Sequence, residues 1–303
     1  MSEQYHIPVL QAPAVEGLQI RPSGVYVDLT FGGGGHSRAI LGQLGEGGRL
    51  IAFDQDEDAW EYAPADEPRF QLVRHNFRYL RYFLDYLGVS AVDGILGDLG
   101  VSSHHFDMAD RGFSFRFDGA LDMRMGPGSE ITAARILNEY PEEKLLTLFR
   151  KYGEVPSPGR LVKAISSFRQ HSSFQRTGQL KEVAETLAPR HDAARYLARV
   201  FQALRIEVNG EMEVLKEVLI QMPEVLKSGG RLVVISYHSL EDRMVKNLVR
   251  SGNPDRAQAD TDLYGNRLVP FKSITRKVIQ PSVEEIEQNS RARSAKLRIA
   301  ERL

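Results

Sequence analysis

The stretch DLTFGGGGH at residues 28–36 decides the fold of this chain. The residues that lead into it, GVYVDLTF at 24–31, form an apolar run rich in β-branched and aromatic side chains, which is typical of a strand. The residues that follow, HSRAILGQL at 36–44, carry apolar side chains at helical spacing. A glycine-rich turn between a strand and a helix allows a ligand to approach the backbone closely. We therefore expect an α/β fold with a ligand site at this turn.

Further apolar segments predict the rest of a sheet. They are GRLIAFD (48–54), FQLVRHNF (70–77), VDGILGDLG (92–100) and GRLVVISYHS (230–239). Strands that are nearly continuous in apolar residues and are separated by helices indicate a parallel sheet with both faces covered.

The gap between the last two of these strands is too long for a single crossover. It holds a series of helical patterns without strand-like alternation: ITAARILNEY, PEEKLLTLFRKYG, GRLVKAISSFRQ and GQLKEVAETLA. We expect a helical insertion at 126–199, which makes the sheet domain discontinuous, with parts 1–125 and 200–303.

Composition excludes several function classes. The 303 residues include no cysteine, which removes disulfides, thiolate catalysis and cysteine-based zinc sites and fits a reducing cytoplasm. The eight histidines show no HxxxH or HExxH spacing, so we expect no metal site. The start, MSEQYHIPVL, lacks the features of a signal peptide, and no apolar run reaches membrane-spanning length. We expect a cytoplasmic protein.

Charge is uneven along the chain. Residues 1–100 are acidic, whereas residues 243–303 are basic and end in the tail NSRARSAKLR. The tail cations Arg291, Arg293, Lys296 and Arg298 could bind the phosphates of RNA. An alternative is that KLRIAERL is an edge strand with charged side chains facing outward, and both interpretations can hold.

The spacing of the glycines within the turn narrows the range of candidate ligands. The dinucleotide fingerprint needs a glycine where Ser37 or Arg38 stands, and the phosphate-binding P-loop needs a lysine that is missing here. S-adenosylmethionine has no phosphate, but it has a cationic sulfonium and a ribose. Asp54 is suited to the ribose hydroxyls, while Asp28 and Asp98 place negative charge near the cation. Glycine turns and strand-end acids also occur in many other α/β folds.

The later motifs are more specific. DLTFGGGGHS, DGILGDLGVSS, RGFSF, LDMRM, FQALRIEVN, GGRLVVISYHSLEDR and NSRARSAKLR occur in this order. Together they resemble the bacterial MraW (RsmH) family over essentially the whole chain. The resemblance implies a class I (Rossmann-like) S-adenosylmethionine methyltransferase sheet with an inserted all-helical, RNA-recognising domain. It also implies methylation of the N4 amino group of a cytidine at the decoding centre of 16S rRNA, with the small ribosomal subunit as partner.

The resemblance also implies a set of functional residues. The cofactor contacts fall on Gly34, Gly35, His36, Asp54, Phe77, Asp98 and His105. Phe77 is expected by the adenine, and His105 stands where relatives often have glutamine.

Cytosine N4 is a poor nucleophile because its lone pair is delocalised into the ring. We expect Asp98, or a carbonyl of Leu99 or Gly100, to accept a hydrogen bond from N4; the alternative is that Asp98 binds only the cofactor. In the segment 111–125, Phe113 and Phe115 could stack on a base or could pack within the protein. Rival functions are an RNA-binding assembly factor that retains a cofactor site and a methyltransferase with another substrate.

Overall fold

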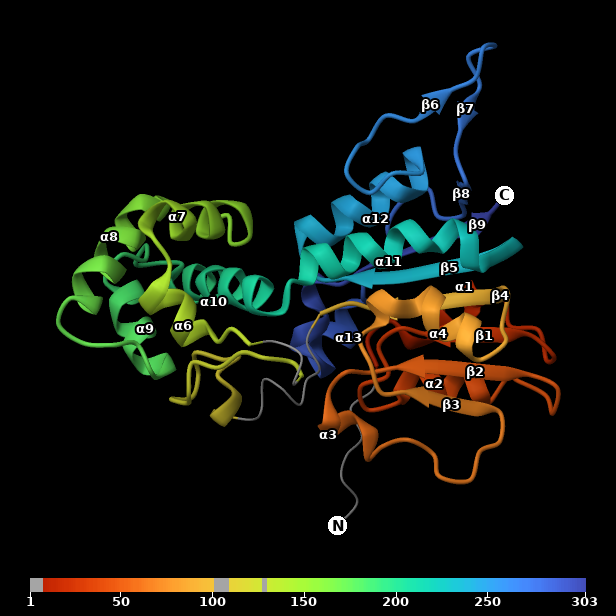
Figure 1. The fold of residues 1–303 in the computed structure, drawn as a ribbon, viewed down its shortest axis with the longest axis horizontal. Coiled ribbons are helices and arrows are strands. Elements are labelled where there is room, and N and C mark those ends of the chain that lie inside the picture. Colours follow the sequence, from red (N-terminus) through yellow and green to blue (C-terminus); the bar gives the residue numbers. More distant parts are fainter. Residues whose placement is uncertain (1–7, 101–108, 127–129) are drawn as a thin grey trace. The chain divides into compact units, whose positions relative to one another are not determined.

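The computed structural model describes residues 8–100, 109–126 and 130–303, and the chain forms two compact units (Figure 1). Unit 1 comprises Met1–Gly100 and Met212–Leu303, and unit 2 comprises Val101–Glu211. In the described part of the chain, no helix combines the length and the apolar composition that a membrane crossing requires.

Unit 1 is built on a seven-stranded sheet with the order β3-β2-β1-β4-β5-β9-β8. Its strands are β1 (Val25–Asp28), β2 (Arg49–Phe53), β3 (Phe70–Val73), β4 (Val92–Asp98), β5 (Leu226–Ser236), β8 (Phe271–Ser273) and β9 (Lys296–Arg302). The strands β1 to β5 pair in parallel, and β9 pairs antiparallel with both β5 and β8. The sequence-predicted parallel sheet and α/β class are thus confirmed.

The strand β9 is not at an edge of the sheet, so the edge-strand interpretation of KLRIAERL was wrong. Its neighbour β8 has only three residues, too few to show a strand pattern in the sequence. Leu297 and Ile299 of β9 are buried, which explains why apolar residues alternate with charged ones in this segment.

Helices cover both faces of the sheet. The helices α1 (Gln11–Leu18) and α2 (Gly35–Leu41) bury Leu18 and Ile40 against one face, in a cluster that includes Leu50 and Val233. The helices α4 (Leu80–Tyr86) and α11 (Glu211–Val225) lie on the opposite face (Figure 1). They are joined where the Arg81 N–H of α4 donates to Oε1 of Gln221 in α11 at 2.8 Å.

The remaining elements of unit 1 are short, except for the 13-residue α12 that follows β5. They are α3 (Glu57–Trp60), η1 (Phe77–Tyr79), α12 (Ser239–Ser251), the hairpin strands β6 (Asp260–Thr261) and β7 (Arg267–Leu268), α13 (Val283–Gln288) and η3 (Ser290–Ser294).

Unit 2 is helical in its described residues, apart from one isolated bridge. After the short η2 (Ala109–Arg111) come α6 (Ala133–Glu139), α7 (Glu142–Lys151), α8 (Pro158–Arg169), α9 (Thr177–Glu185) and α10 (Ala193–Asn209). Its core contains the fully buried Phe149 and Phe174 and the apolar face of α10. Burial of each such side chain contributes about 1.5–3 kcal/mol, which lets unit 2 hold a core of its own.

The boundaries of unit 2 differ from the sequence-based boundaries of 126 and 199. At the C-terminal side, residue 199 falls inside α10, whose buried Val200 and Leu204 belong to the same core as its first turns. At the N-terminal side, the segment 111–125 belongs to unit 2, because its Leu121 N–H donates to the Gln175 carbonyl at 2.8 Å. Both differences arise from tertiary packing, which local periodicity does not report.

Candidate functional site

The glycine turn joins β1 to α2 at the carboxyl edge of the sheet. Gly32 and Gly34 have φ of 50° and 74°, a region that favours glycine. A Cβ added at Gly32 or Gly33 would meet no described atom within 4 Å, so the backbone at these two positions is open to a ligand.

The other two glycines of the turn serve the fold. A Cβ at Gly34 would lie 2.9 Å from the Phe31 ring, and a Cβ at Gly35 would lie 2.1 Å from Cγ of Pro8. Of the residues that the family resemblance selected, Gly34 and Gly35 are therefore packed within unit 1. The sequence did not single out Gly32 and Gly33, because spacing alone does not tell which glycines are closely packed and which have open space beside them.

Asp54 follows β2 and binds the glycine turn directly. Its carboxylate accepts from the backbone N–H of Gly32 at 2.7 Å and of Asp56 at 2.9 Å. Burial raises the pKa of Asp54 to about 6, against the lowering effect of these two N–H donors. The acid that the sequence assigned to the ribose hydroxyls thus lies beside the open part of the turn.

Phe77 begins η1, close along the chain to a contact with the end of β2. Asn76, the preceding residue, donates through Nδ2 to Oε1 of Gln55 at 2.8 Å, and Gln55 is adjacent to Asp54. Phe77 itself is only half-buried. An accessible aromatic ring in this position is suited to lie against a planar base.

Asp98 ends β4 and has the most polar surroundings of the strand-end acids. The Tyr237 hydroxyl donates to its Oδ1 at 2.8 Å, and Nδ1 of His36 lies 3.8 Å from its Oδ2. Burial raises the pKa of Asp98 to about 6, and His36 and Tyr237 act in the opposite direction. Burial also lowers the pKa of His36 and, with Asp98, raises that of Tyr237. At neutral pH this arrangement holds an ionised carboxylate between two neutral rings.

Asp28 and Thr30 fix the backbone beneath this cluster. The fully buried Asp28 carboxylate accepts from Ser37 Oγ at 2.7 Å and from Thr30 N–H at 3.0 Å. Thr30 Oγ1 in turn accepts from Asp98 N–H at 2.7 Å. Burial raises the pKa of Asp28, and its hydrogen bonds with Ser37 and Thr30 lower it. These contacts link the ends of β1 and β4 through side chains.

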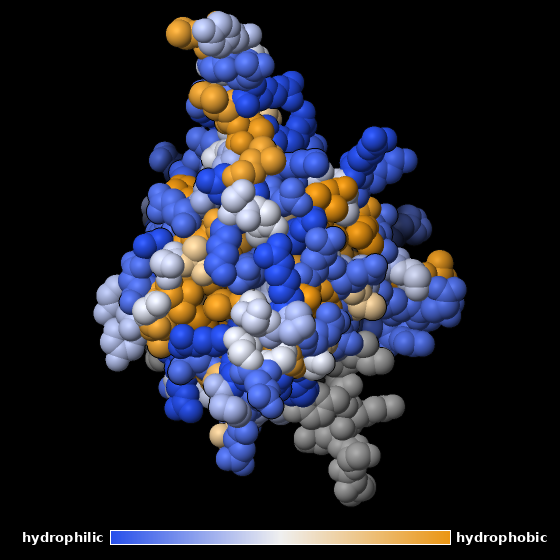
Figure 2. Space-filling view, turned by 90° about the vertical axis from the view of Figure 1, so that its right-hand side faces the viewer, coloured by the Kyte–Doolittle hydropathy of each residue, from blue (hydrophilic) through white to orange (hydrophobic). Residues whose placement is uncertain are grey.

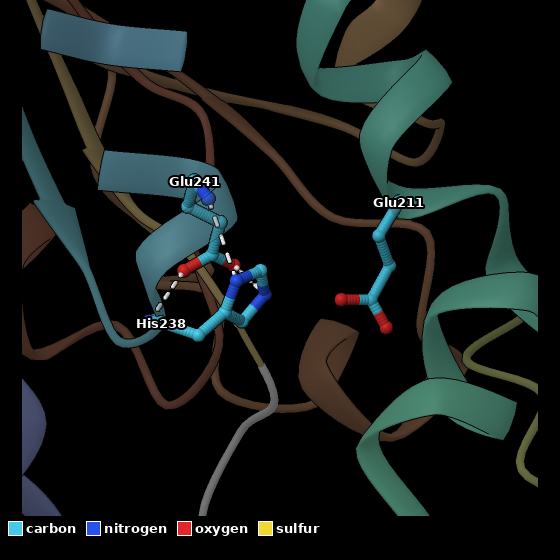
Figure 3. Close-up of side chains that lie close together, drawn as sticks. All are labelled: Glu211, His238 and Glu241. Carbon is cyan, nitrogen blue, oxygen red and sulfur yellow. Dashed lines mark hydrogen bonds and ion pairs between the residues drawn. The ribbon is translucent and has the colours of Figure 1, made fainter. Parts of the chain in front are cut away.

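A capping box sets the position of Tyr237. Figure 3 shows His238 and Glu241 at the start of α12, where the two side chains face each other. The His238 backbone N–H donates to the Glu241 carboxylate at 3.3 Å, and Nδ1 of His238 accepts from the Glu241 backbone N–H at 3.4 Å. The same carboxylate accepts from the backbone N–H of Tyr237 at 2.8 Å. This capping box is a structural reason for the YHSLE sequence after β5.

The structure therefore brings six residues of the sequence-predicted set to one edge of unit 1: Gly34, Gly35, His36, Asp54, Phe77 and Asp98. His105 lies outside the described residues. Tyr237 was missed, although it directly follows β5, which places it at this same edge by topology.

The arrangement fits a cationic ligand that carries a ribose. Asp28, Asp54 and Asp98 concentrate negative charge around an open backbone turn, and burial opposes their ionisation. A bound cation would favour the ionised carboxylates. S-adenosylmethionine combines these features.

Two sequence-based interpretations of aromatic and basic residues change. Phe113 is buried and Phe115 packs edge-on against Phe201 with ring centroids 5.6 Å apart, so packing within unit 2 accounts for both. In the basic tail, Arg298 is bound to Asp242, with Nε–Oδ1 at 2.7 Å. These side chains are therefore less free for RNA than the sequence suggested.

Comparison with known proteins agrees with this geometry. The model of the MraW methylase family matches residues 3–303. The chain is similar to proteins named ribosomal RNA small subunit methyltransferase H. It is 56% identical to that of Bacteroides thetaiotaomicron over 298 residues, which are 98% of this chain and 97% of the relative. It is 53% identical to that of Flavobacterium johnsoniae over 300 residues (99% and 98%), and 54% identical to that of Cytophaga hutchinsonii over 299 residues (98% and 99%). The chain belongs to the MraW methylase family.

Proposed function

We propose that this protein uses S-adenosylmethionine to methylate the N4 amino group of a cytidine at the decoding centre of 16S rRNA in the small ribosomal subunit. The observation that carries the proposal is the Asp98 carboxylate, held by Tyr237 and His36 at the edge where the glycine turn is open. The names of the relatives support an rRNA substrate. Such a substrate implies action in the cytoplasm, and unit 2 remains a proposed RNA-recognition domain.

The cofactor is assigned to the turn and its neighbours. When bound, it supplies an electrophilic methyl group on a sulfonium. Asp54 would accept from the ribose hydroxyls, Phe77 would lie against the adenine, and His36 would lie on the cofactor side of Asp98. Asp28 and Asp98 would stabilise its positive charge. Gly34, Gly35 and His105 remain proposed cofactor contacts.

Asp98 also has a proposed catalytic role. An acceptor beside N4 draws a hydrogen of the amino group and localises the lone pair on nitrogen, which makes it a better nucleophile. Tyr237 donates a hydrogen bond to Oδ1 of Asp98. The other oxygen, Oδ2, lies 3.8 Å from Nδ1 of His36 and is the oxygen proposed to accept from N4. Tyr237 is thereby a positioning residue, because it acts through Asp98. Holding N4 in line with the methyl group supplies the remaining rate enhancement.

Transfer of a labelled methyl group to purified small subunits from cells that lack this methylation tests the function. We expect label on one cytidine of 16S rRNA, with the added mass on N4 in nucleoside mass spectrometry. Binding to subunits without transfer would instead support an assembly factor, and label on another substrate alone would contradict the rRNA assignment.

Cofactor affinity is expected to depend on pH in a defined direction. The pKa values of Asp54 and Asp98 are raised to about 6, so both carboxylates gain protons as the pH falls through 6. We expect the Kd for S-adenosylmethionine to rise by about ten-fold per pH unit below 6 for each carboxylate that must be ionised. Calorimetric titration between pH 5 and 7.5 measures this.

S-adenosylhomocysteine, which lacks the sulfonium charge, is the control ligand and should show the weaker pH dependence.

The stability of the ligand-free protein should change with pH in the opposite direction to cofactor affinity. Because the folded-state pKa values lie above the ordinary 3.8, the folded state binds more protons than the unfolded chain between these values, and stability falls as the pH rises through that window. A Kd that stays constant from pH 5 to 7.5 would exclude charge complementarity as the basis of binding.

A further inference from the structure

The hairpin formed by β6 and β7 carries exposed apolar side chains at its end. Leu263 and Tyr264, between the two strands, are 101% and 90% exposed, and Leu268 in β7 is also exposed. The hairpin stands out from the rest of unit 1 in both views (Figures 1 and 2). Because these exposed apolar side chains are grouped on one hairpin rather than scattered, they have the character of an interaction surface.

The tip has a defined conformation. The Asp262 carboxylate accepts from the backbone N–H groups of Tyr264 and Asn266, both at 2.8 Å, and from the side-chain amide of Asn266 at 2.9 Å. Gly265 supplies the positive φ of 83° that closes the turn. Leu263 and Tyr264 are thus presented by a closed turn, which lowers the entropic cost of binding through them.

Both bases of the hairpin are fixed to unit 1. On one side, Asp255 pairs with Lys216 of α11 at 2.5 Å, and Ser251 Oγ of α12 donates to the Arg256 carbonyl at 2.6 Å. On the other side, the buried Phe271 begins β8, which pairs with β9. The hairpin is therefore anchored at both ends to the sheet and helices of unit 1.

Of the three carboxylates in residues 255–262, two form ion pairs, and the third, Asp262, keeps its charge because hydrogen bonds within the turn lower its pKa. Asp255 and Asp260 form ion pairs with Lys216 and Arg256, and Asp262 is used by the turn. Four exposed cations form no side-chain hydrogen bond or ion pair with the described residues: Arg267, Lys272, Arg276 and Lys277. These cations extend from β7 through β8 to the segment beside Ile299 of β9, and they outnumber the one unpaired carboxylate, so this surface is complementary to a polyanion.

The hairpin lies far from the glycine turn within unit 1. It leads into β8, where Phe271 pairs with Arg302 near the end of β9. Because β9 is antiparallel to β5, this end of β9 lies beside Arg231, at the amino end of the parallel strands. The glycine turn is at the opposite, carboxyl edge, so the hairpin does not reach the reacting atoms.

We propose that the hairpin is a docking element for structured RNA at a distance from the methylated nucleotide. Tyr264 stacks on an unpaired base, Leu263 packs beside it, and the four cations bind the flanking phosphates. This inference rests on the proposed function, since it assigns a second contact on the same large RNA substrate. An exposed aromatic ring with four unpaired cations against one unpaired carboxylate, Asp262, fits RNA better than it fits a protein surface.

Methylation kinetics with small subunits test the docking role. We expect Tyr264→Ala to raise the KM for small subunits by about ten-fold, the effect of losing one base–aromatic stack. The kcat and the Kd for S-adenosylmethionine should stay unchanged. The double variant Arg267→Glu and Lys272→Glu should also raise KM and should reduce the dependence of subunit binding on salt concentration. Tyr82→Ala, which removes an exposed tyrosine from α4, is the matched control and should leave KM unchanged.

Comparison of three substrates identifies the partner. Small subunits and protein-free 16S rRNA should both bind the Tyr264→Ala variant more weakly than the parent protein. A short RNA that spans only the target nucleotide should bind both equally. If weakening occurs with subunits but not with protein-free rRNA, a ribosomal protein is the partner and the RNA assignment fails. If KM is unchanged while the parent protein transfers methyl, the docking proposal alone fails; absence of transfer by the parent protein would contradict the proposed function instead.

Discussion

Replacing Asp98 by asparagine is expected to lower the kcat for methyl transfer by about 100-fold or more, the range seen for loss of a general acid–base group. An asparagine keeps the volume and the hydrogen bond from Tyr237, but it removes the negative charge that draws a hydrogen from N4. The Kd for S-adenosylmethionine should rise less than kcat falls, because Asp28 and Asp54 still supply negative charge. Single-turnover rates at saturating cofactor and direct cofactor titration separate the two effects.

Asp93→Asn is the matched control for this experiment. Asp93 lies near the start of the same strand, where it binds Lys227 and the backbone N–H of Val25. Its replacement costs stability at a position remote from the carboxyl edge, and kcat should remain at the parental value in a folded sample. If Asp98→Asn loses cofactor affinity in proportion to turnover, Asp98 is only a cofactor ligand, and the acceptor for N4 has to be a backbone carbonyl.

Replacing Gly112 by alanine is expected to destabilise unit 2 by about 2–5 kcal/mol. Gly112 has φ of 72°, where an L side chain costs roughly 1–2 kcal/mol. The added Cβ would also lie 2.0 Å from the backbone oxygen of Ala120, so the segment 111–125 must shift. A loss of this size lowers the Tm by about 10 °C or more in a unit of this length. Thermal unfolding and hydrogen exchange across residues 109–126 measure it.

Gly159→Ala is the control for the glycine substitution. Gly159 lies in the first turn of α8 with no described atom near its Cβ position, so alanine should leave stability unchanged or raise it slightly. Parental stability of Gly112→Ala would mean that the RGFSF segment is not fixed to unit 2 in the way the hydrogen bonds of Leu121 and Met123 indicate.

The site was predictable to the extent that its residues are local in sequence. Asp54 and Asp98 each follow a recognisable strand, and parallel strands place their carboxyl ends along one edge. The glycine turn was recognisable for the same reason. Its division into two open and two packed glycines was not, because the packing of Gly35 depends on Pro8 and that of Gly34 on Phe31.

Unit 2 shows the same limit of local sequence patterns in predicting the fold. Helices α6 to α9 could be read from their 3.6-residue periodicity, since each buries one face. The sequence boundary at 199 divided α10 because periodicity marks a helix but does not tell which core it joins. Likewise, the short β8 gives no pattern of its own, and only its pairing with β9 reveals that KLRIAERL is an internal strand.

The sequence by itself determined the α/β class, the glycine turn, the acids at the strand ends and the family to which the chain belongs. Each of these depends on local spacing, which the backbone converts directly into position. The tertiary structure decided which groups surround Asp98, which glycines are open to a ligand and where unit 2 begins and ends. Tyr237 and Asp98 are 139 residues apart in sequence, and their contact arises only because β4 and β5 are neighbours in the sheet.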